Sequence, residues 1–189
     1  MEASPSFNDA YASPGPPVWA GTVEGAMSLP RILIAVALAL LVACGGDEPD
    51  GNAKQLDATF ERFDGTTGRF SDYRGKPVVL NFFSSTCTPC RTEMPAFERV
   101  HQRFGDAVVF LGMNVQDTVE GGKAFVESVG ITWELGRDPN GAILQGEIGG
   151  VGLPTTAVLD RDGRIVYVHL GPLEADELTK QLRDRSLIT

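Results

Sequence analysis

Two cysteines separated by two residues are the clearest chemical feature of this sequence. Cys87 and Cys90 enclose Thr88 and Pro89, and the pair closely follows an apolar stretch at residues 78–83. This spacing on a turn brings two sulfurs within bonding distance, so the pair can cycle between dithiol and disulfide. The thiolate is the attacking form in such an exchange. We expect Cys87 to attack a partner disulfide and Cys90 to resolve the mixed disulfide that results.

The residues around the pair predict a strand that runs into a helix. Residues 78–83 are apolar, β-branched or aromatic apart from one asparagine and show no alternation, which is typical of a strand buried on both faces. After the cysteines, apolar residues recur at spacings of three and four as far as Phe104, which indicates one face of a helix. Pro89 suits the first helical position and Thr88 suits the N-cap. Cys87 then lies just before a helix N-terminus, where the helix dipole favours a thiolate.

The remaining pattern predicts one α/β domain with a central mixed sheet flanked by helices. The strand preceding the cysteines, the helix after them and the next strand form a βαβ unit, which is right-handed in nearly all proteins. We also expect an N-terminal β-hairpin and a helix–strand insertion in the middle of the domain. Further strands are expected at 57–63, 69–70, 108–115, 131–135, 155–159 and 165–170, and further helices at 119–129, 142–148 and 173–187.

The first part of the chain has the features of an exported protein. Residues 1–26 are rich in Pro, Gly, Ala and Ser and lack periodicity, which is typical of disorder. Arg31 and the apolar residues 32–43 then form a signal-peptide pattern that ends in a small residue before Cys44. This apolar run is shorter than the about 20 residues that a membrane-spanning helix needs. A short buried core helix is the alternative interpretation of the run.

The four residues from Leu41 to Cys44 resemble the bacterial lipobox, whose cysteine becomes the lipid-modified first residue of the mature protein. This resemblance implies that Cys44 is lipidated and anchors the protein at the extracytoplasmic face of a cell membrane. We therefore expect a disordered extension and signal peptide at 1–43, which are removed, a lipidated flexible tether at 44–56, and a folded domain at 57–189.

The composition restricts the classes of partner and site. The chain of 189 residues has a formal net charge of −9 and no basic cluster, so nucleic acid is not an expected partner. Half of a zinc site is the alternative interpretation of the cysteine pair. Structural zinc needs four ligands, and Cys44, His101 and His169 supply no second close pair. The sequence therefore favours redox chemistry, with no metal and no cofactor.

From about Asp57 to its end, the chain resembles the TlpA/ResA-type thioredoxin-like proteins. Members of that family are extracytoplasmic, membrane-tethered thiol–disulfide oxidoreductases, and many reduce apocytochrome c or other exported proteins. The resemblance implies a thioredoxin-like fold, exported protein substrates, a membrane thiol–disulfide electron donor or acceptor as partner, and a monomer. The matching stretches are 76–82 (KPVVLNF), 87–90 (CTPC), Glu93 with Pro95, 138–141 (DPNG) and 150–156 (GVGLPTT).

The resemblance also implies roles for single residues. Pro154 matches the family's cis-proline, which faces the cysteine pair and helps to dock the substrate backbone. Glu93 matches the family's acid near the active-site thiols; a first-turn glutamate that only favours the helix dipole is the alternative. Asn81 stands where cytoplasmic thioredoxins carry a buried acid, so proton transfer must use another group or water. Thr86 replaces the family's usual tryptophan, which leaves Cys87 more exposed.

A copper-binding metallochaperone of the same fold is the alternative function, because soft thiolates select Cu(I). Such carriers resemble this fold, but their cysteines are separated by three residues and a histidine lies near a later strand. In this chain the spacing is two, and His169 lies on a predicted strand. A peroxidase would need a single peroxidatic cysteine after a Pro and Thr pattern, which the sequence lacks. Trp133 is expected in the core rather than at a ligand site.

Overall fold

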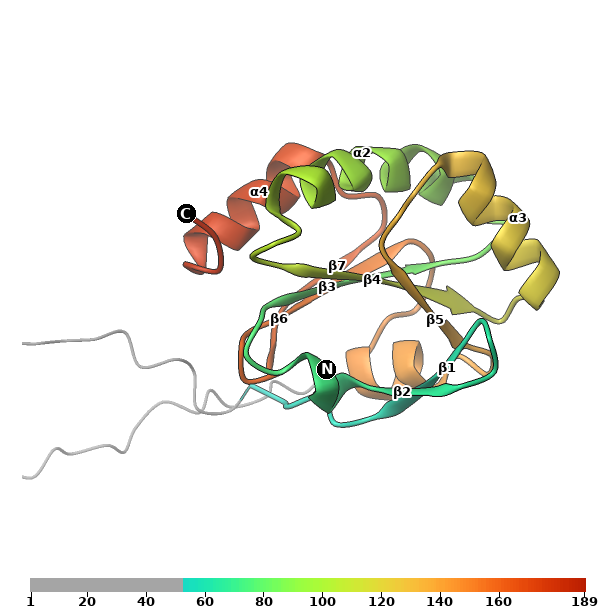
Figure 1. The fold of residues 1–189 in the computed structure, drawn as a ribbon, viewed down its shortest axis with the longest axis horizontal. Coiled ribbons are helices and arrows are strands. Elements are labelled where there is room, and N and C mark those ends of the chain that lie inside the picture. The colour runs from blue at the N-terminus through green and yellow to red at the C-terminus, as the bar shows by residue number, and fades with distance from the viewer. Residues whose placement is uncertain (1–52) are drawn as a thin grey trace, which may run out of the picture. The chain divides into compact units, whose positions relative to one another are not determined.

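A computed structural model describes residues 53–189, so the predictions for residues 1–43 and for Cys44 lie outside the described residues. In the described part, strands form one mixed sheet in the order β2-β1-β5-β4-β3-β6-β7 (Figure 1). The strands are β1 (Thr59–Arg62), β2 (Thr67–Arg69), β3 (Val78–Phe83), β4 (Val109–Val115), β5 (Glu134–Asp138), β6 (Thr155–Leu159) and β7 (Ile165–Leu170). The helices are α2 (Thr88–Phe104), α3 (Val119–Val129) and α4 (Ala175–Asp184), with a 3-10 helix η1 (Phe70–Tyr73) and a π-helix η2 (Ile143–Ile148).

Strand β3 lies in the interior of the sheet, and every one of its residues is buried. It pairs in parallel with β4 and antiparallel with β6. Side chains alternate along a strand, so Val79 and Phe83 pack in the core beneath α2, α3 and α4. Leu80 and Phe82 pack in the core on the other face, where η2 lies against the sheet (Figure 1). Both faces are therefore covered, as the unbroken apolar run predicted.

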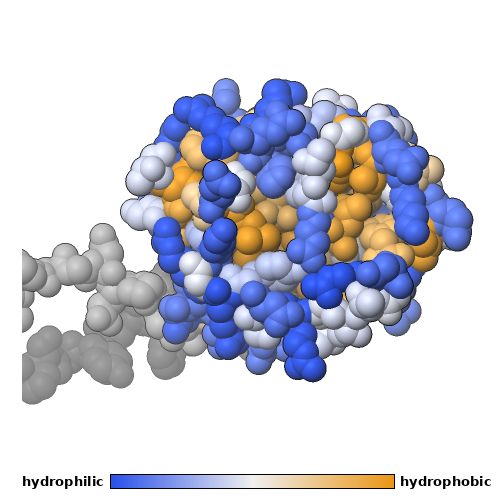
Figure 2. Space-filling view, in the orientation of Figure 1, coloured by the Kyte–Doolittle hydropathy of each residue, from blue (hydrophilic) through white to orange (hydrophobic). Residues whose placement is uncertain are grey.

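Polar groups cover most of the outside of these layers. Figure 2 shows hydrophilic residues over the outer surface of the helices and loops, with apolar residues visible between the helices and the sheet. Leu178 and Leu182 of α4 are fully buried against the sheet and α2, as their helical spacing predicted. Among residues 53–189, no helix has the length and apolarity that crossing a membrane requires.

The predicted thioredoxin-like architecture is confirmed, but several element boundaries were wrong. The second hairpin strand, expected at 69–70, is β2 at Thr67–Arg69, and Phe70 already belongs to η1. The strand expected at 131–135 is β5, which begins to pair with β4 only at Glu134. The apolar side chains of Ile131 and Trp133 lie in the core just before the strand begins, and Trp133 is buried as expected. The helix expected at 173–187 is shorter, because Leu173 belongs to the loop that contacts the first turns of α2.

The folded part begins before residue 57, so the predicted tether at 44–56 extends too far. Leu56 is buried, and its N–H donates to the carbonyl of Gly163 at 2.9 Å in the β6–β7 turn. Because β6 runs antiparallel to β3, this turn lies at the start of β3. The chain therefore joins the domain at the end of the sheet opposite to Cys87.

Candidate active site

A disulfide joins Cys87 and Cys90, with 5.4 Å between their Cα atoms. Cys90 is fully buried, whereas Cys87 retains 9% of its surface exposed. A partner sulfur can therefore reach Cys87 and has no direct route to Cys90. This difference in access agrees with the predicted roles of attacking and resolving cysteine, which remain predictions.

Cys87 is the N-cap of α2, which corrects the expectation for Thr88. The backbone of Cys87 is extended, and its Sγ accepts a hydrogen bond from the N–H of Cys90 at 3.2 Å. Thr88 is already the first helical residue, and Pro89, which has no N–H to leave unpaired, follows it. The sulfur itself therefore occupies the cap position, where the helix N-terminus stabilises a negative charge.

A hydroxyl-rich turn carries the chain from β3 to Cys87. The N–H of Cys87 donates to the carbonyl of Ser84 at 3.1 Å. The hydroxyls of Ser84 and Thr86 lie 3.2 Å apart, and Thr86 is exposed. A small polar side chain thus occupies the place beside Cys87 where the TlpA/ResA resemblance leads one to expect an aromatic ring.

Glu93 is buried beneath α2, with 4% of its surface exposed. Its Oε1 accepts a hydrogen bond from Nδ2 of Asn81 at 2.6 Å, and its Oε2 accepts one from the N–H of Leu173 at 2.7 Å. Burial raises the pKa of Glu93 to about 7, and the hydrogen bonds from Leu173 and Asn81 offset only part of that rise. The carboxyl group can therefore gain or lose a proton near neutral pH.

The contact between Asn81 and Glu93 was not predicted from the sequence. Alternation along β3 points Asn81 to the same face as Val79 and Phe83, which is the face that α2 covers. The Oδ1 of Asn81 is buried and has no hydrogen-bond partner. A half-turn of this amide would let Oδ1 accept a hydrogen bond from protonated Glu93. The pair can therefore accommodate the carboxyl group in either protonation state.

Pro154 precedes β6 beside the end of β3 that leads to the cysteines. The Leu153–Pro154 peptide bond is cis, as the resemblance implied. The carbonyl of Pro154 accepts a hydrogen bond from the N–H of Gly171 at 2.9 Å, and Thr155 pairs with Phe82 in the sheet. The structure thus brings Pro154, Glu93 and the cysteine pair to one end of the sheet. The role of Pro154 in docking remains a prediction.

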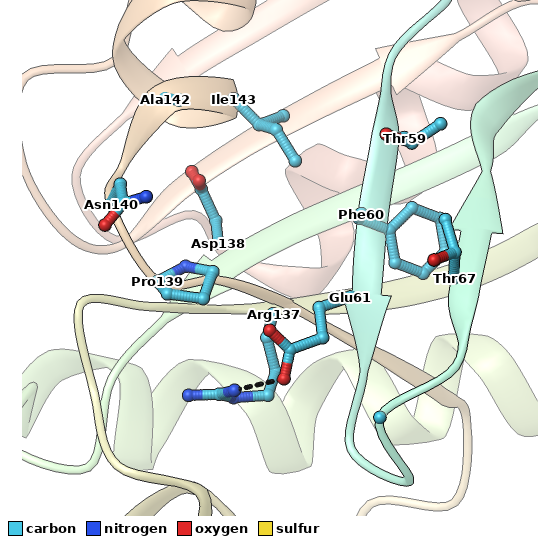
Figure 3. A pocket seen from close by; sticks show the side chains of 11 residues that line it. Thr59, Phe60, Glu61, Thr67, Arg137, Asp138, Pro139, Asn140, Ala142 and Ile143 are labelled. Carbon is cyan, nitrogen blue, oxygen red and sulfur yellow. Dashed lines mark hydrogen bonds and ion pairs between the residues drawn. The ribbon is translucent and has the colours of Figure 1, made fainter.

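A small cleft of about 200 Å³ opens between α2 and residues 172–174, and Glu93 is among the residues that line it. A cleft of this size holds several water molecules, so Glu93 has a route to solvent that does not pass the disulfide. A larger cavity of about 440 Å³ lies elsewhere, between β1 and the residues after β5 (Figure 3). The larger cavity contains no cysteine.

The alternative of a copper carrier finds no support in the arrangement of ligands. Across residues 53–189, no three His, Cys, Asp or Glu side chains are grouped as a metal site requires. The ring of His169 instead lies 3.2 Å from the carbonyl of Pro172 and 3.4 Å from the hydroxyl of Tyr167.

Comparisons with known proteins agree with this geometry. The sequence model of the AhpC/TSA family matches residues 50–168. Thiol-disulfide oxidoreductase ResA of Geobacillus thermodenitrificans is 32% identical over 145 residues, which covers 75% of this chain and 77% of that protein. A DsbF homologue from Corynebacterium diphtheriae superposes with a TM-score of 0.65 at 30% identity, covering 75% of this chain and 96% of that one. The exposed lipoprotein thioredoxin of Streptococcus pneumoniae superposes with a TM-score of 0.58 at 29% identity, covering 68% and 98%.

Proposed function

The chain belongs to the AhpC/TSA family and is a thiol–disulfide oxidoreductase, and on that premise we propose that it exchanges disulfides with exported proteins at the outer face of a cell membrane. The observation that carries the proposal is the disulfide at the N-terminus of α2, in which Cys87 retains some exposure and Cys90 has none. We assign Cys87 as the nucleophile and Cys90 as the resolving cysteine.

Two displacements move two electrons between the protein and its substrate. The Cys87 thiolate attacks one sulfur of a substrate disulfide, which forms a mixed disulfide and releases the other substrate sulfur as a thiolate. The Cys90 thiolate then attacks Sγ of Cys87 and releases the second substrate thiolate. The substrate leaves as a dithiol and the Cys87–Cys90 disulfide is restored. The same steps in reverse oxidise a substrate, and a membrane thiol–disulfide partner resets the pair in either case.

In this proposal, Glu93 accepts the proton that the buried Cys90 thiol releases. Cys90 must lose its proton before it attacks, and it has no surface exposed to water. Glu93 lies three residues further along α2, so the two side chains are neighbours on the helix. With a pKa of about 7, Glu93 can accept the proton and pass it to water through the cleft beside residues 172–174.

The surface around the disulfide supports a protein as substrate. Residues 84–90, 149–155 and 170–173 contain no charged residue, although 22% of the chain is charged. Among residues 53–189, the exposed large hydrophobic side chains are Val151 and Leu170, exposed by 88% and 52%, and both flank the Pro154 segment. An uncharged apolar surface fits an extended polypeptide that docks by backbone and apolar contacts. Exported apocytochrome c is one such substrate, because its C-x-x-C-H haem-attachment motif can form an internal disulfide.

Lipidation at Cys44 would attach the tether to the domain at a point remote from the disulfide, which leaves Cys87 free for a substrate. The chain joins the domain at Leu56, against the β6–β7 turn, at the end of the sheet opposite to Cys87. The nine residues 45–53 can span at most about 30 Å when fully extended. The similarity to an exposed lipoprotein thioredoxin of known structure supports an anchor of this kind.

Trapping of reaction intermediates tests the proposed chemistry. The Cys90→Ser variant should accumulate mixed disulfides with exported proteins, because no thiol remains to release them, and Cys87→Ser should accumulate none. In the reduced wild type, iodoacetamide should modify Cys87 faster than Cys90. Faster modification of Cys90 would reverse the assignment. Cys44→Ala serves as the control for anchoring: it should lose membrane association and keep its exchange activity in solution.

A further inference from the structure

We propose that Asp117 is a positioning residue for disulfide exchange, which acts through Ser85 on the segment that presents Cys87. The inference rests on the proposed function of the cysteine pair and adds a residue to it. Asp117 lies in the loop between β4 and α3, and it contacts neither cysteine in the described hydrogen-bond network.

The carboxylate of Asp117 accepts four hydrogen bonds, and the two from Ser85 join its loop to the loop that leads to Cys87. Its Oδ2 accepts one from the N–H of Ser85 at 2.6 Å and one from Nδ2 of Asn114 at 3.0 Å. Its Oδ1 accepts one from the hydroxyl of Ser85 at 2.9 Å and one from the N–H of Thr118 at 2.8 Å. Two donors face each oxygen of the side chain. An amide has a single oxygen, so only a carboxylate can accept all four hydrogen bonds. Although burial alone raises the pKa of Asp117, the hydrogen bonds from Asn114 and Ser85 outweigh it, and the pKa lies below its ordinary value.

The sheet places these two loops side by side. β3 and β4 are parallel and in register, with Phe83 opposite Asn114, so the loops that follow them leave the same edge of the sheet. Gln116 then adopts a left-handed backbone conformation with a φ of 47°, which is uncommon for a residue other than glycine. Its N–H donates to the carbonyl of Asp138 at 3.1 Å. The chain thus turns sharply just before Asp117, and such conformations concentrate at functional sites.

Two glycines of α3 leave room for the network. A Cβ atom on Gly121 would lie 2.9 Å from the hydroxyl of Thr118, 3.0 Å from Oδ1 of Asp117 and 3.1 Å from the hydroxyl of Ser85. A Cβ atom on Gly122 would lie 2.7 Å from Oδ1 of Asn114. Neither position needs glycine for its backbone conformation, because neither φ value lies in the left-handed region. The Asp117–Ser85 contact and the Thr118 cap together therefore leave little room for a side chain at position 121.

Arg137 binds the backbone carbonyl of Asp117. Its Nη2 donates to the carbonyl of Asp117 at 3.1 Å, and its Nη1 pairs with Glu61 of β1 at 2.5 Å (Figure 3). Arg137 is buried, with 9% of its surface exposed, so the guanidinium has little freedom to move. The Asp117 loop is therefore fixed against β5 and β1, and the Ser85 loop is fixed against Asp117.

This network sets the geometry of Cys87. Ser85 is two residues before Cys87, inside the turn in which the N–H of Cys87 donates to the carbonyl of Ser84. The turn places Sγ of Cys87 at the N-terminus of α2, where a thiolate is stabilised. Without the carboxylate, both donors of Ser85 lose their acceptor, the turn gains other conformations, and the thiolate spends less time at the helix N-terminus. Loosening the network should therefore raise the pKa of the Cys87 thiol.

Two variants of Asp117 separate positioning from charge. Asp117→Ala removes the charge and all four acceptor bonds, whereas Asp117→Asn removes the charge and keeps an oxygen for the N–H of Ser85. We would measure the pKa of Cys87 from the rate of iodoacetamide modification against pH in the reduced full chain. The pKa of Cys87 should be about 0.5 units higher in Asp117→Ala than in Asp117→Asn, which is the size of a typical helix-dipole contribution. Equal values in the two variants would overturn the proposal.

The Gly121→Ala variant tests the proposal even if Asp117→Ala fails to fold. The Gly121→Ala variant keeps the charge of Asp117, and alanine has a higher helix propensity than glycine. Its methyl group crowds the Asp117–Ser85 contact. The pKa of Cys87 should therefore again rise by about 0.5 units relative to wild type. An unchanged pKa would contradict the proposal. Asp160→Ala is the matched control, because Asp160 accepts backbone hydrogen bonds from Asp162 and Arg164 at 2.9 Å in the distant β6–β7 turn. It should leave the pKa of Cys87 unchanged.

The alkylation readout needs no protein substrate. If the wild type fails to exchange disulfides with glutathione, the proposed function fails, and the reactivity of Cys87 still decides whether Asp117 positions it.

Discussion

Replacing Glu93 by glutamine should make the oxidised protein more stable at alkaline pH. The glutamine has the shape of the carboxyl group and no charge. Its oxygen can accept the hydrogen bond from the N–H of Leu173, which Oε2 of Glu93 accepts at 2.7 Å. After a half-turn of the Asn81 amide, which now donates through Nδ2 to Oε1 of Glu93, the glutamine amide can donate to Oδ1 of Asn81, the buried atom that has no partner in the wild type. The substitution therefore removes the ionisable group and keeps the packing and hydrogen bonds around it.

The pKa of Glu93 sets the sign and the size of the effect. The carboxyl group has a pKa of about 7 in the folded chain, compared with 4.5 as its ordinary value, and burial is the main cause. Between these two values the folded chain binds the proton and the unfolded chain does not, so the wild type loses stability as the pH rises through this window. With these two pKa values the loss between pH 5 and pH 8 is about 2–3 kcal/mol, at about 1.4 kcal/mol for each unit. Glu93→Gln should lack this loss.

Urea unfolding of both oxidised proteins at pH 5 and pH 8 measures the difference. The advantage of Glu93→Gln over wild type should be about 2–3 kcal/mol larger at pH 8, which is a shift of about 1 M in the urea midpoint for a protein of this size. All other titrating groups are common to both proteins and cancel. Glu127→Gln, on the exposed face of α3, is the control and should show no such shift. An advantage that is equal at the two pH values would refute the reasoning.

The same substitution tests the proposed proton transfer. The rate at which Cys90 releases a mixed disulfide should show an inflexion near pH 7 in the wild type, where Glu93 changes its protonation state. The inflexion should be absent in Glu93→Gln. An unchanged pH–rate profile would remove Glu93 from the mechanism.

Two further predictions concern the surface and the core. Val151→Asp should raise the preference for a basic over an acidic peptide disulfide about fivefold at low salt, because it places a charge on an uncharged surface; an unchanged preference would mean that Val151 does not face the substrate. Leu178→Ala should lower the free energy of unfolding by about 2–5 kcal/mol, because Leu178 is fully buried on the inner face of α4. Lys180→Ala, which only breaks an exposed ion pair with Asp184 on the same helix, should cost less than about 1 kcal/mol in the same denaturation experiment.

The sequence alone determined the parts of this protein that depend on local pattern. The buried strand β3, the cysteine pair and the helix α2 follow one another directly, so residue type and spacing along a short stretch were sufficient to predict them. The same holds for the β6–β7 hairpin, whose strands are joined by a short turn. The order of these elements, together with the matching stretches, was enough to indicate the thioredoxin-like fold and the exchange chemistry.

Local pattern was less reliable where a buried apolar residue does not pair with a neighbouring strand. Trp133 is apolar because it enters the core, so the apolar run suggested a strand earlier than the pairing at Glu134. The N-cap of α2 was misassigned for a related reason: threonine is a common cap, but the cap is decided by which atom accepts the first free N–H, and that atom is Sγ of Cys87.

Only the tertiary structure decided which distant groups surround the cysteines. Asn81 meets Glu93 because the alternation of β3 and the face of α2 happen to coincide, and Glu93 meets the N–H of Leu173 across 80 residues of chain. Asp117 reaches Ser85 because β3 and β4 are adjacent and parallel, although 32 residues separate them. Such contacts have no local signature, since the positions of both partners depend on how the whole sheet and its helices pack.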